Sequence, residues 1–150
     1  MQIKQFFLQA LDLDKQIKAK QAQIQQRRDM QTDVSKTMQP DKVQTTKKND
    51  RLGDITAALL DLIDSYARDV TRLLRMKYDI KIIIDRIENA DYRTVLEWRY
   101  ASYLKWEDIA EKMHMNERYI HKLHQKALVA AEKTADANTQ NDANNFVDNF

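Results

Sequence analysis

The chain has 150 residues, 32% of them charged, and a formal net charge of +2. Its mean hydropathy of −0.73 is too polar for one compact globule of this length. The single glycine and the single proline exclude a fold built on tight β-hairpins. The lack of cysteine excludes disulfides and thiolate metal sites, and no apolar run is long enough to span a membrane. The composition therefore predicts an all-α protein with long helices and no membrane contact.

An amphipathic helix is predicted over residues 1–30, followed by a flexible linker over residues 31–52. The apolar residues of the first segment recur at steps of three and four, which places them on one helix face. They are Ile3, Phe6, Ala10, Leu13, Ile17 and Ile24. Lys20 interrupts this seam. The second segment is rich in Ser and Thr and holds only isolated apolar residues, too few to offset the entropy of ordering it.

The clearest pattern in the chain predicts a long helix over residues 53–90. Its seam keeps strict three-four spacing through Leu52, Ile55, Leu59, Leu62, Tyr66, Asp69, Leu73, Met76, Ile80, Ile83 and Ile87. Asp69 is its only charged member. A second stripe, formed by Leu60, Ile63, Val70, Leu74 and Ile84, widens the apolar face. The first helix in a hairpin, the C-terminal domain, or another copy in a coiled coil could cover this face, and the pattern leaves these options open.

Three short amphipathic segments then predict a helix-turn-helix domain over residues 91–134. Ala110 provides the small residue where two helices touch, Met113 and Met115 bracket the turn, and Asn116 is placed to cap the next helix. The inner face of that helix, residues 116–133, would hold Ile120, Leu123, Ala127 and Leu128. Its outer face would hold Glu117, Arg118, His121, Lys122, Gln125 and Lys126. Residues 135–150, with three aspartates and no Lys or Arg, are expected to be a disordered acidic tail.

Three stretches of this domain, residues 95–100, 106–110 and 119–128, resemble the fourth conserved region of bacterial sigma factors, which binds a promoter element. With the long N-terminal helical arm, the layout is similar to phage late-gene regulators of the ArpU and RinA type from Gram-positive hosts. The resemblance implies base reading by Glu117, Arg118, His121 and Lys122. It also implies a phosphate contact by Lys126, to which Lys105 and Arg99 are added as further phosphate candidates.

The chemistry of these residues agrees with such a role. Arg118 and Lys122 can donate to guanine O6 and N7, and Glu117 can accept from cytosine N4. Without the turn motif, the same basic residues would be interpreted as a solvated helix face. Two positions depart from the family pattern: Ala101 replaces the usual glycine, and Lys105 replaces the usual Ser or Thr cap, which weakens that cap by ~1 kcal/mol.

The leading hypothesis is a sequence-specific transcription regulator of phage or prophage late genes, acting on double-stranded DNA in the cytoplasm of a bacterial host. RNA polymerase and a second copy of the chain are candidate partners. Two alternatives stay open: a small terminase subunit, which also joins a helix-turn-helix to oligomerising helices, and a helical adaptor without DNA binding. We expect that the protein is not an enzyme and binds no cofactor, since the sequence has no Gly-rich loop or activated nucleophile. His121 and His124 lack a third ligand at suitable spacing, so no metal is expected.

Overall fold

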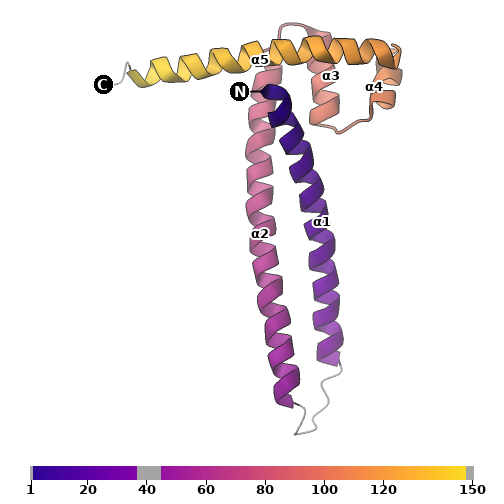
Figure 1. Cartoon of the computed structure of the whole chain (residues 1–150), viewed down its shortest axis with the longest axis vertical. Helices are drawn as coiled ribbons and strands as arrows, with labels where there is room; N and C mark the ends of the chain where they lie inside the picture. Colours follow the sequence, from indigo (N-terminus) through magenta and orange to yellow (C-terminus); the bar gives the residue numbers. More distant parts are fainter. Residues whose placement is uncertain (1, 37–44, 148–150) are drawn as a thin grey trace. The chain divides into compact units, whose positions relative to one another are not determined.

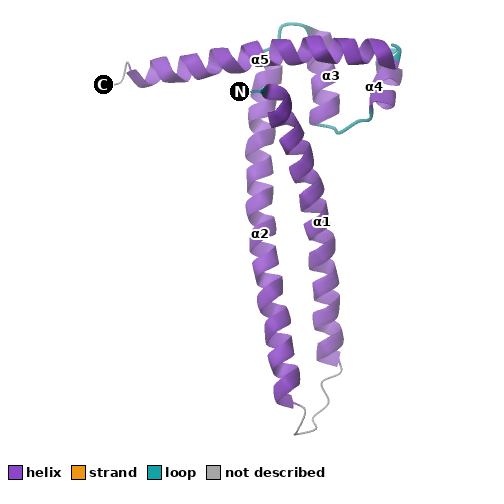
Figure 2. Cartoon of the chain, viewed as in Figure 1, coloured by secondary structure: helices purple, strands orange, loops and turns teal. Residues whose placement is uncertain are grey.

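The computed structural model describes residues 2–36 and 45–147, and this part of the chain is all α, without strands (Figures 1 and 2). Its helices, in chain order, are α1 (Ile3–Lys36), α2 (Thr45–Asp85), α3 (Ala90–Tyr100), α4 (Trp106–Met113) and α5 (Glu117–Val147). They form two compact units, one of residues 13–73 and one of residues 1–12 with 74–150. None of the described helices is both long enough and apolar enough to cross a membrane.

The unit of residues 13–73 is a hairpin in which α1 and α2 run side by side (Figure 1). Leu13, Ile17 and Ile24 of α1 are buried in it, as are Leu59 and Leu73 of α2. The predicted α2 seam is therefore covered within the chain along this unit, by the first helix. Of the options that the sequence left open for this seam, the structure shows the hairpin.

The two charged residues that interrupt the apolar seams of the hairpin lie opposite each other. Lys20 forms an ion pair with Asp69, and its Nζ also donates to Ser65 Oγ at 2.7 Å. One turn away, Gln21 Nε2 donates to Tyr66 Oη at 2.8 Å. A charge on a packing face is stabilised only opposite a partner, so a shift of α1 along α2 would leave both charges facing apolar side chains. This pair therefore fixes the register of the hairpin.

The linker predicted over residues 31–52 is wrong for most of its length. Helix α1 continues to Lys36 and α2 begins at Thr45, while residues 37–44 lie outside the described residues. These extra turns carry polar side chains and one half-buried apolar residue, Val34. Thr32 and Ser35 each donate to a carbonyl one turn back, and Gln31 Nε2 donates across the hairpin to Thr56 Oγ1 at 2.9 Å. The long helix also ends earlier than predicted, at Asp85, before a short turn leads into α3.

The disordered tail predicted from residue 135 is also wrong, because the backbone of α5 stays helical to Val147. Residues 148–150 lie outside the described part. The segment 117–147 contains neither Gly nor Pro and is rich in Ala, which has the highest helix propensity, so nothing in it terminates the helix.

The apolar face of α1 is rotated slightly from the predicted one at its first turns. Phe7 is fully buried, whereas Phe6, the predicted seam residue, is only half-buried. The reason is a specific contact: the Phe7 ring packs on the Tyr100 ring, with centroids 4.9 Å apart. Just before it, the Ile3 backbone N–H donates to Glu132 Oε2 of α5 at 2.7 Å. The start of α1 is thus part of the core that carries α3 and α5.

Candidate nucleic-acid interface

Helices α3, α4 and α5 enclose a small apolar core that fixes the direction of α5. The core consists of Val95, Ile109, Ala110, Ile120 and Leu123, all at most 7% exposed. Partly buried side chains surround it: Tyr92, Trp98, Leu104, Trp106, Met113 and Met115. The predicted small contact and the turn-bracketing methionines are confirmed.

The corner between α4 and α5 has the geometry of a tight helix-to-helix turn. His114 closes α4 in the left-handed region, with φ 55°, and the Met115 N–H donates to the Ala110 carbonyl at 3.0 Å. Asn116 Oδ1 then accepts from the Tyr119 N–H at 2.7 Å, so the predicted N-cap is confirmed. The turn closes directly over Ala110, where a larger side chain would separate the helices.

The opposite face of α5 is solvent-exposed and rich in hydrogen-bond donors. All six side chains predicted for it are exposed: Glu117, Arg118, His121, Lys122, Gln125 and Lys126. Arg118, Lys122 and Lys126 are spaced four residues apart, so they form one basic stripe along the first turns of the helix. The inner face, with Ile120 and Ala127 fully buried, lies on the other side.

Arg99 makes contacts within the domain. Its guanidinium donates from Nη1 to the Leu104 carbonyl at 3.0 Å and covers the Trp106 ring at 4.7 Å. It therefore braces the loop between α3 and α4. Lys105, at the start of α4, is exposed and makes no side-chain cap, as its substitution for Ser or Thr predicts. Ala101 is the other position that departs from the family pattern, and its backbone is right-handed. The left-handed residue of this corner is Tyr103, with φ 57°.

His121 and Glu117 are joined to each other on the outer face. His121 Nε2 lies 3.6 Å from Glu117 Oε1, one helical turn away, and its ring packs against the Trp106 ring with centroids 4.7 Å apart. The two residues thus lie at the edge of the basic stripe that faces α4. Among the described residues no group of three His, Asp or Glu side chains is arranged to hold a metal ion.

His124 is the one polar side chain buried in this domain among the described residues, at 4% exposure. Its Nε2 lies 2.8 Å from Tyr100 Oη, and the Trp106 ring packs edge-on against it at 4.7 Å. Burial, with a smaller contribution from the nearby charge of Lys4, lowers the pKa of His124 to about 4. Burial also raises the pKa of Tyr100, which therefore keeps the proton it can donate.

Sequence reasoning missed this polar pair, although a signal was present. His124 is four residues after Ile120 and four before Leu128, so the inner-face spacing already includes it. The sequence also offered no role for Tyr119, which is 49% exposed beside the basic stripe. Its phenol adds a hydrogen-bond donor near the start of α5.

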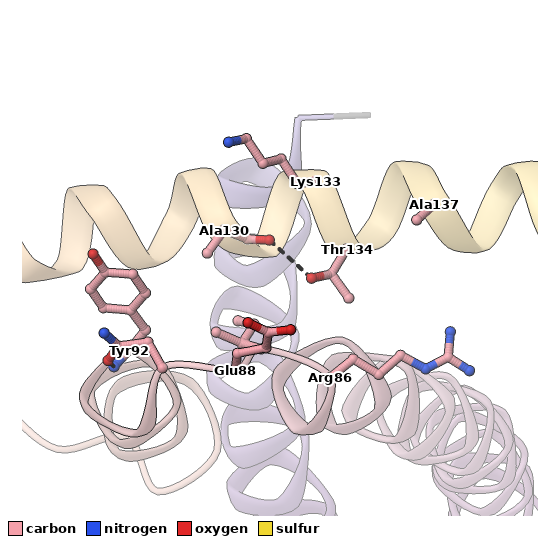
Figure 3. A pocket seen from close by; sticks show the side chains of 9 residues that line it. Arg86, Glu88, Tyr92, Ala130, Lys133, Thr134 and Ala137 are labelled. Carbon is pink, nitrogen blue, oxygen red and sulfur yellow. Dashed lines mark hydrogen bonds between the residues drawn. The ribbon is translucent and has the colours of Figure 1, made fainter.

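A separate shallow groove lies between the turn after α2, the start of α3 and the middle of α5 (Figure 3). Tyr92 and Glu88 border it on one side, and Thr134 projects into it from α5, with its hydroxyl bonded to the Ala130 carbonyl at 3.0 Å. The Arg86 side chain extends away from Glu88 and Tyr92. The polar groups of this groove do not converge on one point, and we assign it no ligand.

The chain matches the sequence model of a known protein family. The sequence model of the family described as "Protein of unknown function (DUF1492)" matches residues 32–132, more than half of the chain. The matched segment contains α2, α3, α4 and the first turns of α5, and hence the whole turn and the basic stripe. Searches of curated proteins and of solved structures return no match.

Proposed function

The chain belongs to the DUF1492 family, and we propose that it is a sequence-specific DNA-binding transcription regulator that places the first turns of α5 in the major groove. The proposal extends to late-gene control in a phage or prophage, in the cytoplasm of a bacterial host. That part rests on the resemblance to regulators of the ArpU and RinA type. The helix-turn-helix part rests on the geometry of the C-terminal helices.

The observation that carries the proposal is the exposed basic stripe of Arg118, Lys122 and Lys126 on the helix that follows the capped turn. A recognition helix needs its N-terminal residues free and its axis held rigidly by a core on the opposite face. Helix α5 meets both requirements, since Ile120 and Ala127 are fully buried behind the stripe. A merely solvated helix would not need the left-handed corner and the Asn116 cap that fix where it starts.

Position along the stripe suggests a division of roles. Arg118 and Lys122 lie in the first turns, where a recognition helix meets base edges. Lys126 lies a further turn along and fits a phosphate contact. Glu117 and His121, at the edge facing α4, are secondary base-reading candidates because each already partners the other. Lys105 remains a candidate phosphate contact, whereas Arg99 would have to give up its loop contact to act as one.

The test is a salt titration of the full chain on a site selected from random duplexes and on a scrambled site. Arg118→Ala and Lys122→Ala should each lose about 1–3 kcal/mol on the selected site and much less on the scrambled one. Lys126→Ala should weaken both alike and reduce the salt slope by about one unit. Lys15→Ala, which removes an exposed lysine from α1, is the charge-matched control. It should change neither the affinity for the two duplexes nor the salt slope.

Equal losses on both duplexes for Arg118→Ala would reduce the stripe to a general electrostatic surface. No loss for any stripe variant would reject DNA binding and favour a helical adaptor. The number of copies in the assembly distinguishes a regulator from the remaining alternative, because a small terminase subunit would form rings of many copies. RNA polymerase stays a candidate partner of the regulator, to be tested once a bound site is known.

A further inference from the structure

Helix α2 carries a second apolar stripe that the hairpin leaves partly open: Leu60, Ala67 and Leu74 are exposed, whereas Ile63 and Val70 are half-buried. Leu60, Ile63, Ala67, Val70 and Leu74 follow each other at steps of three and four, and we call them the outer stripe. Leu60 is 58% and Leu74 63% exposed, although the seam one face away is covered. The predicted fifth member of this set, Ile84, is instead buried at 3%. An exposed stripe with coiled-coil spacing is an interaction surface rather than a scatter of single apolar residues.

The charges beside the outer stripe indicate what covers it. On the flank away from α1, the N-terminal part carries Asp61 and Asp64, and the C-terminal part carries Arg68, Arg72 and Arg75. All five are exposed. None of them forms an ion pair with another of the residues that the structure describes. Acid and base are thus segregated along one flank of one helix.

This segregation suits a second copy of the same helix running in the opposite direction. When two identical helices pack antiparallel through one stripe, the same flank of each copy lies side by side. Asp61 and Asp64 of one copy then face Arg72 and Arg75 of the other, twice by symmetry, whereas Arg68 lies near the symmetry axis beside Arg68 of the other copy. Parallel packing would instead place the charged flank of each copy beside α1 of the other, where its acidic and basic parts do not face each other. The small Ala67, near the middle, permits close approach of the backbones.

We propose that the outer stripe is a homodimer interface in which α2 helices of two copies pack antiparallel, centred between Ala67 and Val70. The alternation of Ile63 against Leu74 and of Ala67 against Val70 then fills the contact with complementary volumes. The dimer presents two copies of α5. The inference does not depend on DNA binding, and its test contains no DNA.

Sedimentation equilibrium of the full chain tests the association. Wild type should sediment as a dimer of 17.8 kDa chains. Leu74→Glu should raise the dissociation constant by at least about 100-fold, because two leucines leave the interface and two buried carboxylates replace them. Val129→Glu, which places the same charge at a comparably exposed apolar position of α5, should leave the dimer intact. Far-UV circular dichroism should show unchanged helicity for both variants.

Cross-linking tests the direction, using the fact that the chain has no cysteine. A mixture of Asp64→Cys and Thr71→Cys chains should cross-link with a short bis-maleimide more efficiently than either chain alone. Preferential cross-linking of Asp64→Cys to itself would show parallel packing and overturn the proposal. A wild-type chain that stays monomeric over its soluble range, or one that binds only a different protein, would overturn it as well. So would a ring of many copies, or a dimer indifferent to Leu74→Glu.

Discussion

The buried histidine of the helix-turn-helix domain makes its stability sensitive to mild acid. In the folded chain the pKa of His124 is about 4, below the ordinary 6.5, because burial penalises its charged form. Unfolding exposes the ring, so between pH 6.5 and about 4 the unfolded chain binds more protons than the folded one. The contribution of the neutral His124 to the free energy of unfolding is therefore complete above pH 6.5, and it is lost as the pH falls toward 4. One pKa unit corresponds to about 1.4 kcal/mol, so the loss from this group is at most about 3 kcal/mol.

Urea unfolding followed by tryptophan fluorescence measures this effect in the right part of the molecule, since Trp98 and Trp106 are the only tryptophans. The variant His124→Gln keeps an amide that can bond to Tyr100 but cannot titrate. Its stability should fall less than that of wild type between pH 6.5 and 4, by up to about 3 kcal/mol. Carboxylates titrate in both chains, so their contribution cancels in the difference. An equal acid sensitivity of the two proteins, or a His124 ring that titrates near 6.5 in the folded chain by NMR, would refute the reasoning.

Two further predictions concern the hairpin. Gly53→Ala should stabilise the chain by about 0.5–1 kcal/mol in thermal melts, since Gly53 lies inside α2 with nothing within 4 Å of an added Cβ; no gain would indicate that residue 53 is not helical. Lys20→Met and Asp69→Leu should each destabilise the hairpin by about 1–3 kcal/mol because each strands a charge, whereas the double variant should recover most of the loss. Additive losses in that cycle would show that the two residues do not interact.

Local patterns in the sequence predicted the helix-turn-helix because every level of the pattern agreed. Ala110, Asn116 and the spacing from Ile120 to Leu128 each specify the same corner and the same inner face, and the structure confirms all of them. The exposed basic stripe follows from the same register. What the stripe binds is a separate question, because exposure and charge do not by themselves identify a ligand.

Helix ends were predicted poorly for a physical reason. Residues 31–36 and 135–147 have few apolar side chains, a composition that is typical of disordered segments. A segment that continues an existing helix escapes the cost of nucleation. The lack of Gly or Pro, with Ala residues in α5 and the bond from Gln31 to Thr56 across the hairpin, suffices to extend it. The same local reasoning could not place Phe7 or Arg99, whose positions depend on contacts with Tyr100 and Trp106.

The polar residues in the seams contain more information than the apolar ones. Any apolar seam can pack against another in several registers, so apolar residues such as Leu59 and Ile17 do not determine which helix covers the seam or in which register. Lys20 and Asp69 each weaken a seam when considered alone, and only their pairing makes both compatible with packing. That pairing occurs within one chain and commits the seam to the hairpin. The outer stripe, with opposite charges segregated along its flank and no counterpart on α1, is then the face of α2 left for a second copy.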